Sequence, residues 1–281
     1  MTRTAPIART APIARTALIA GRGALPGALI AAMDAPPLIC ALEGFPPDGL
    51  PVDQMFRIER LAVFLDWLVG QGVTRVVFAG AVQRPRLDPS LMDPRSAQIL
   101  PRIMAAFQAG DDATLRAIVA IFEEAGLAVV GVADIAPQLV PGAGILAGQT
   151  IAVDDRDAQR AALIVAALGS VDVGQAAVVQ QGLCLAVEVL AGSDAMLQAV
   201  ADLPTTLRPD PLRGKGVFYK APKPGQDRRI DLPTLGENTV QRAAAAGLAG
   251  IAWQAGSVIC LDLPAMINTA ERAGLFLWSR P

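Results

Sequence analysis

The chain has 281 residues, of which 53% are hydrophobic and 18% charged, and its formal net charge is -2. This balance offers no strongly basic surface, so we expect no nucleic-acid partner. The sequence contains no histidine, which excludes histidine-based triads, histidine metal ligands and histidine general bases. Any metal site must therefore use oxygen ligands, which favours Mg²⁺, Mn²⁺ or Ca²⁺.

The N-terminus repeats the unit TAPIAR, which spaces basic residues evenly along an apolar segment. Pro6 and Pro12 interrupt any continuous apolar helix, so the pattern is not typical of a secretion signal. We predict that residues 1–16 form a disordered extension, with a weak contact at a membrane surface as the alternative. No other segment is long and unbroken enough to cross a bilayer, so we expect a soluble, cytoplasmic protein.

The first half of the chain alternates short apolar runs with helical patterns. Unbroken apolar strands between helices are typical of a parallel sheet covered on both faces. We therefore predict an α/β fold that begins with a Rossmann-like domain at residues 17–136. Its strands are expected at 17–20, 37–42, 75–80 and 126–135, and its helices from Leu25, through Leu61–Leu68 and over 96–124 with a break near Gly110.

Residues 137–150 are rich in proline and glycine and predict an interdomain linker. The remainder, 151–281, mixes a hairpin with helices and strands, so we predict a second, mixed α/β domain. Its hairpin is expected at 176–189 with a turn at Gln180–Gly182. Helices are expected from about Asp154 and near 195–200, 239–246 and 266–273, with further strands at 216–221, 251–256, 257–263 and 274–278.

The three cysteines, Cys40, Cys184 and Cys260, lie far apart, each within an apolar run. An odd number of well-separated thiols does not suggest a disulfide framework or a zinc site. We predict that all three are buried and reduced.

Two glycine-bearing turns follow predicted strands in the first half. The sequence GRGALP contains Gly21, Gly23, Leu25 and Pro26 at a strand-to-helix junction, where parallel sheets bind ligands and helix N-termini bind phosphates. Pro26 occupies the third glycine position of the dinucleotide fingerprint, which disfavours a nicotinamide site. A nucleotide or sugar contact and a plain strand–helix turn both remain open.

The second glycine-bearing turn ends the strand at 75–80. Gly80 closes this strand, and Arg84 follows as either a ligand contact or a solvated loop residue. Farther along, GDDATLR places Asp111, Asp112 and Arg116 at a helix start, where N-capping explains one of the acids.

Several acidic or amide side chains in the second half lie beside apolar runs. Glu188 falls inside the strand pattern LCLAVEVLAG, and a buried carboxylate must be paired or bound to metal. The alternative is a solvent-facing residue on an edge strand. Asp194 could bind metal or merely cap the following helix, while Asp172 and Gln175 complete the candidates.

The segment Lys220–Gly236, KAPKPGQDRRIDLPTLG, combines four cations with three prolines. Lysine and arginine neutralise phosphate oxygens, and a carboxylate binds Mg²⁺ or orients water, which together suit phosphoryl chemistry. Local chemistry favours an anion site only slightly over a charged surface loop. The candidate residues here are Lys220, Lys223, Gln226, Arg228, Arg229, Asp231 and Thr234.

These segments, in this order, resemble the LpxI-type UDP-2,3-diacylglucosamine pyrophosphatases of lipid A biosynthesis. The matching pieces are LIAGRGALP, VVFAGAVQRP, GDDATLR, DVGQAAVVQQGLCLAVEVLAGSDAML, KAPKPGQDRRIDLPTLG and AAAAGLAGIAWQAG. They span the chain from about Ala17 to its end, and the TAPIAR repeat lies outside them.

The resemblance implies a two-domain, Mg²⁺-dependent hydrolase that holds its substrate between the domains and releases UMP and 2,3-diacylglucosamine 1-phosphate. It also implies that Asp231, in the motif DLPT, is essential for catalysis. The competing hypotheses are a nucleotide or lipid-phosphate binding protein without turnover and a nicotinamide-dependent oxidoreductase. A homodimer and a peripheral contact with the cytoplasmic face of the inner membrane are kept as hypotheses.

From charge and position we assign the remaining roles. The expected substrate contacts are Gly21, Gly23, Leu25, Pro26, Gly80, Arg84, Lys220, Lys223, Gln226, Arg229 and Thr234. The expected Mg²⁺ ligands are Asp231, Glu188, Asp194 and Asp172.

Overall fold

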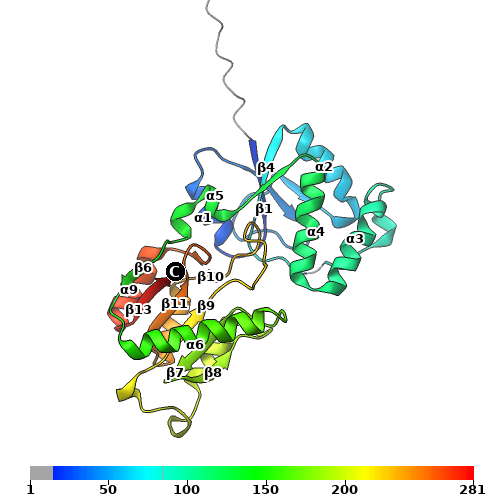
Figure 1. Cartoon of the computed structure of the whole chain (residues 1–281). Coiled ribbons are helices and arrows are strands. Elements are labelled where there is room, and N and C mark those ends of the chain that lie inside the picture. The colour runs from blue at the N-terminus through cyan, green and yellow to red at the C-terminus, as the bar shows by residue number, and fades with distance from the viewer. Residues whose placement is uncertain (1–14, 84) are drawn as a thin grey trace, which may run out of the picture.

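The structure is a computed structural model that describes residues 15–83 and 85–281. Figure 1 shows two lobes, one built from the blue to green first half of the chain and one from the green to red second half. Each lobe contains a sheet with helices packed against it, as predicted for a two-domain α/β fold.

The first lobe alternates strands and helices, because its apolar runs are short and separated by glycine- or proline-bearing turns. Its strands are β1 (Arg15–Ala20), β2 (Leu38–Leu42), β3 (Gln54–Phe56), β4 (Val73–Ala79) and β5 (Ala128–Val130). Its helices are α1 (Leu25–Ala32), α2 (Leu61–Gly70), α3 (Ser96–Ala109), α4 (Asp111–Glu124) and α5 (Val132–Ile135), with short 3₁₀ helices at Ile58–Arg60, Pro89–Leu91 and Pro137–Leu139.

The five strands of this lobe form one parallel sheet in the order β3-β2-β1-β4-β5. The chain runs outward from β1 through β2 to β3 and then returns to the other side of β1. This makes the gap between β1 and β4 the switch point of the sheet, where open α/β folds bind ligands beyond the carboxyl ends of the strands. The predicted Rossmann-like outline is confirmed.

The second lobe has the mixed sheet β6-β13-β11-β9-β7-β8. Its central strands β13, β11 and β9 are parallel, whereas β6, β7 and β8 pair antiparallel with their neighbours. These strands are β6 (Gly144–Ala147), β7 (Ala176–Gln180), β8 (Leu183–Val187), β9 (Val217–Lys220), β11 (Gly250–Gln254) and β13 (Phe276–Arg280).

The helices of the second lobe cover this sheet, and a two-stranded ladder stands apart from it. The helices are α6 (Ala152–Gly169), α7 (Gly192–Ala201), α8 (Glu237–Ala245) and α9 (Leu263–Ala273), with 3₁₀ helices at Thr205–Leu207 and Pro211–Arg213. The ladder pairs β10 (Thr234–Leu235) with β12 (Ile259–Cys260). None of the helices in the described ranges is long and apolar enough to cross a bilayer.

The structure differs from the sequence-based expectation in several details, of which four bear on the domains and the thiols. Arg15 and Thr16 belong to β1, so the predicted extension overlaps the sheet, and residues 1–14 lie outside the described part. The strand expected over 126–135 covers only Ala128–Val130, because Gly131 starts the short helix α5. Within the predicted linker, Gly144–Ala147 forms β6, since it pairs with the edge of the C-terminal sheet.

The fourth difference concerns Cys184. Cys40 and Cys260 are buried, as predicted, whereas Cys184 is exposed. It lies on β8, the strand at the free edge of the mixed sheet, where no further strand of the described chain covers it. The apolar run that contains Cys184 suggested burial, but its position at the edge of the sheet leaves Cys184 exposed.

Candidate active site

The loop 221–233 leaves the C-terminal sheet at β9 and lies against the N-terminal lobe. Ile230 packs beside the core that α2 and α4 form with the N-terminal sheet. Leu232 packs beside a second N-terminal core that contains Leu18 and Leu29. The proline-rich segment is therefore a bridge between the lobes, with Asp231 between its two apolar anchors.

Gly21 and Gly80 bring the ends of β1 and β4 into close contact beneath this loop. The Gly21 N–H donates to the Ala79 carbonyl at 2.8 Å, and Arg22 and Ala81 exchange two backbone hydrogen bonds. A Cβ on Gly21 would lie 2.6 Å from the Ala81 oxygen, and one on Gly80 would lie 2.6 Å from the Gly21 carbonyl carbon. Gly80 also has φ +93°, so both positions require glycine because the backbones nearly touch.

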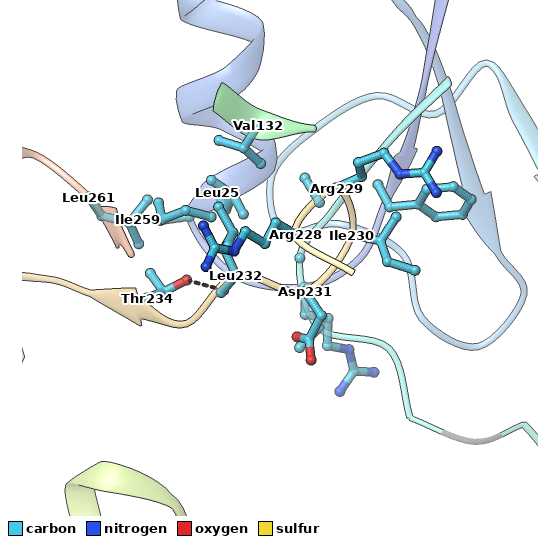
Figure 2. Close-up of a pocket in the computed structure, with 17 residues that line it drawn as sticks. Leu25, Val132, Arg228, Arg229, Ile230, Asp231, Leu232, Thr234, Ile259 and Leu261 are labelled. Atoms are coloured by element: carbon cyan, nitrogen blue, oxygen red, sulfur yellow. Dashed lines mark hydrogen bonds between the residues drawn. The ribbon is translucent and has the colours of Figure 1, made fainter. Parts of the chain in front are cut away.

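A pocket of about 290 Å³ opens at this switch point, between the β1 and β4 turns and the loop. Figure 2 shows Leu25, Val132, Ile259 and Leu261 forming an apolar side, with Arg228 and Arg229 leaving the loop in different directions. Its lining joins residues from both lobes, namely Arg22–Leu25, Phe78–Ala81, Val132, Arg228–Leu232, Thr234, Ile259 and Leu261. The pocket therefore lies between the two lobes, the region where the resemblance places the substrate.

Asp231 lines the pocket, and Gln226 holds its carboxylate. The Gln226 Nε2 donates to Asp231 Oδ2 at 2.6 Å and to the Asp231 backbone carbonyl. The Gln226 side chain is buried behind the loop, so Asp231 reaches the pocket from a fixed support.

Lys220 is buried at the end of β9 and is surrounded by acids. Its Nζ donates to Ser193 Oγ at 2.7 Å and lies 3.6 Å from Glu188 Oε1. Burial lowers the pKa of the Lys220 ammonium, while Glu188, Asp194 and Asp231 act in the opposite direction. Lys220 therefore balances a concentration of negative charge beside the loop.

The other loop cations divide into two that form ion pairs and one that forms none with the described residues. Lys223 forms an ion pair with Asp172. Arg229 pairs with Asp227 at 2.7 Å and with Glu123 of α4 at 2.6 Å, and these partners raise the pKa of its guanidinium. Arg228 is exposed and lines the pocket, which leaves its guanidinium available to an anion.

The acids expected to bind metal are spread over different contacts. Glu188 accepts from Ser193 at 2.7 Å and pairs with Lys220, and Asp194 pairs with Arg242 at 3.3 Å. Within the described ranges, no three Asp, Glu or Cys side chains gather into a metal-binding group. Of the four predicted ligands, Asp231 lines the pocket. Glu188 follows β8 directly, so the predicted position inside the strand is wrong. Its side chain is half-buried and paired with Lys220, so the solvent-facing alternative is wrong as well.

The pocket brings together six of the residues predicted from the sequence: Gly23, Leu25, Gly80, Arg229, Asp231 and Thr234. Gly21 shapes the turn through backbone contacts, and Pro26 lies buried in the first turn of α1. Lys220 at the end of β9 does not line this pocket, Lys223 and Gln226 of the loop line a second pocket instead, and Arg84 is outside the described residues.

Sequence reasoning missed Arg22 and undervalued Arg228, both of which line the pocket. Arg22 lies over the Phe45 ring, 6.0 Å from its centroid. Its position between Gly21 and Gly23, directly after the first strand, was a usable signal, because side chains at strand carboxyl ends face the ligand crevice. Arg228 carried no such signal, since its neighbour Arg229 has the same charge.

Comparison with known proteins agrees with this two-lobed site. The LpxI N-terminal domain model matches residues 15–139, and the LpxI C-terminal domain model matches residues 142–278. A similar protein is the UDP-2,3-diacylglucosamine pyrophosphatase LpxI of Caulobacter vibrioides (strain ATCC 19089 / CIP 103742 / CB 15). It is 41% identical over 211 residues, which is 75% of each chain. The chain belongs to the LpxI family.

Proposed function

We propose that this protein hydrolyses the pyrophosphate bond of UDP-2,3-diacylglucosamine, releasing UMP and 2,3-diacylglucosamine 1-phosphate for lipid A biosynthesis. The relative from Caulobacter vibrioides carries this substrate in its name. The observation that carries the proposal is that Asp231, Arg22 and Arg228 line one pocket at the β1–β4 switch point. A pocket lined by a carboxylate and two arginines suits a pyrophosphate and the water that attacks it.

The pocket at the switch point is small for this substrate, but a second pocket lies close to it. A second pocket of about 380 Å³ lies on the other side of the loop, between the loop and α6, and Arg228 lines both. A pyrophosphate joins two large groups, so a substrate held around Arg228 can extend in two directions. Within this arrangement Arg228 and Arg22 bind phosphate oxygens, and Asp231 orients the attacking water.

Mg²⁺ fits this donor set through Asp231. Magnesium is usually bound by one or two carboxylates together with substrate phosphates, and retains several waters. Asp231 lines the pocket where the pyrophosphate would lie, so it is the residue that would hold the ion, while Glu188, Asp194 and Asp172 already pair with protein cations. The ion would supply Lewis-acid neutralisation of phosphate charge.

The test is a single assay on the purified full-length protein with UDP-2,3-diacylglucosamine, following UMP with Mg²⁺ or with EDTA. We expect Mg²⁺-dependent release of UMP and its loss in Asp231→Asn. Asp202→Asn, which changes an exposed carboxylate bonded to Gln198, is the matched control and should retain activity. Tight substrate binding without UMP release would instead identify a non-catalytic binding protein.

A cytoplasmic location with peripheral contact at the inner membrane follows from the same substrate, whose acyl chains reside in a bilayer. Val171, Val173, Val189 and Leu190 are exposed apolar residues on two neighbouring loops of the C-terminal lobe. Flotation with phospholipid vesicles tests this contact, and loss of flotation in Leu190→Asp would support it.

Analytical ultracentrifugation tests the homodimer, and a monomer at all concentrations would exclude it.

A further inference from the structure

The Gln226 side chain has no polar capacity left for substrate. Its Nε2 donates to Asp231 Oδ2 and to the Asp231 carbonyl. Its Oε1 accepts from Gln175 Nε2 at 2.8 Å and from the Lys223 backbone N–H at 2.8 Å. A glutamine amide offers two donor hydrogens and two acceptor lone pairs, and all of them are used here.

The orientation of this amide is fixed by its partners. Both Asp231 atoms can only accept, and the Lys223 N–H can only donate. Turning the amide over would place its oxygen against the carboxylate and its NH₂ against a backbone N–H. The group that faces Asp231 is therefore a hydrogen-bond donor.

Gln226 is in turn tied to the C-terminal sheet rather than to the loop alone. Gln175 precedes β7, its backbone carbonyl accepts from Ala221 at 3.0 Å, and its backbone N–H donates to Glu188. Through Gln175, the support of Asp231 reaches the Glu188–Lys220 pair. The loop is proline-rich, and Ile230 and Leu232 on either side of Asp231 pack in the opposite lobe, so this contact connects the Asp231 carboxylate to the C-terminal sheet.

The geometry points to Gln226 as the positioning residue for Asp231, with Gln175 as its anchor, rather than as a substrate contact. This rests on the proposed function, in which Asp231 orients the attacking water. A carboxylate that rotates freely would direct water into the correct approach less often, and misplacement of a reacting group by about 1 Å can cost roughly 100-fold in rate. Gln226 therefore acts on turnover and not on binding.

Gln226→Glu separates the donor role from packing. The variant is close to isosteric and keeps the acceptor for Gln175 and Lys223, but at neutral pH it loses the donors and places a second carboxylate beside Asp231. We expect kcat for UMP release to fall by roughly 100-fold with KM within about threefold of wild type. Activity should recover in part at acidic pH, where a protonated Glu side chain can donate again.

Gln226→Met and Gln175→Met complete the series, because Met fills similar space without the amide. Gln226→Met should lower kcat as Gln226→Glu does, but without recovery at acidic pH. Gln175→Met should lower kcat less than Gln226→Met does. Gln180→Met is the matched control: Gln180 is also buried and bonded, to Pro209, Gly214 and Arg208, at the other end of β7. It should cost stability while leaving kcat unchanged.

The outcomes are distinct. If wild-type protein releases no UMP, the proposed function fails before this inference is tested on turnover. If wild type is active and Gln226→Glu is folded by circular dichroism, an unchanged kcat overturns the positioning role. A rise in KM at constant kcat in Gln226→Glu would instead show that Gln226 contacts the substrate. If Gln180→Met lost as much kcat as Gln226→Met, the effect would be explained by lost stability.

Discussion

Arg229 and Glu123 are 106 residues apart in the sequence, yet their side chains form a 2.6 Å ion pair between the two lobes. Arg229 belongs to the loop that carries Asp231, and Glu123 lies in the last turn of α4. The same guanidinium also binds Asp227 within the loop. This pairing orders the loop and docks it on the N-terminal lobe with one side chain.

Replacing Glu123 by Gln should remove the interlobe charge pair while keeping the Asp227 contact. Since both side chains are partly exposed, the free energy of unfolding should fall by less than about 1 kcal/mol. We expect a larger effect on activity, with kcat/KM for UMP release reduced several-fold because the loop docks less often. The control is Glu124→Gln, which changes the next residue of α4 and breaks its exposed pair with Arg102 of α3; it should leave kcat/KM unchanged. Equal effects of the two substitutions would contradict a role for docking.

Gly80→Ala should destabilise the protein more than an ordinary substitution at a positive φ. The new Cβ would meet the Gly21 carbonyl carbon at 2.6 Å and the Arg22 oxygen at 2.8 Å, in addition to the cost of φ +93°. Gly72→Ala is matched to it, because Gly72 has φ +73° and a Cβ added there would have nothing within 4 Å. Urea unfolding should show that Gly80→Ala costs at least about 1 kcal/mol more than Gly72→Ala, and equal costs would refute the close approach.

The Asp227–Arg229 pair should contribute to stability in a defined pH window. The Arg229 guanidinium holds the pKa of the Asp227 carboxyl below its usual range. A carboxylate with a depressed pKa in the folded state contributes stability above the unfolded pKa of about 3.9, and this contribution is lost as pH falls through the lower folded value.

Between about pH 6 and about pH 3, wild type should therefore lose more unfolding free energy than Asp227→Asn, by less than about 1 kcal/mol because Arg229 is partly exposed. Urea titrations at both pH values measure this difference. Arg229→Gln removes the cation and should reduce the pH dependence in the same way. A pH dependence in Asp227→Asn as steep as in wild type would show that the pair contributes nothing.

The three thiols should react at different rates. Burial raises the pKa of Cys40 and of Cys260 to about 12, so neither forms the reactive thiolate near neutral pH. Cys184 is exposed on β8, and a thiol reagent such as DTNB should label it in the native protein. Denaturation should release the two buried thiols, and Cys184→Ser should abolish the native reaction. Rapid native labelling in that variant would contradict the burial of Cys40 and Cys260.

The sequence was sufficient for the fold class, and it singled out segments that line the candidate pocket. Unbroken apolar runs between helical patterns specified a parallel sheet, since such strands are buried on both faces. Glycines after the first and fourth strands marked the crevice, because ligands collect at strand carboxyl ends. The proline-rich loop was identifiable from its composition, and Asp231 from the ordered set of motifs.

The tertiary structure decided what each charged residue does. Lys220, Lys223 and Arg229 looked alike as phosphate ligands, but each is paired with an acid of the protein. Arg22 and Arg228 line the pocket and form no ion pair with the described residues. Gln226 showed no sequence feature that predicted four hydrogen bonds around Asp231. A pairing depends on distances that arise only when β7, β9 and α4 are packed around the loop, and residue type and spacing along the chain do not contain those distances.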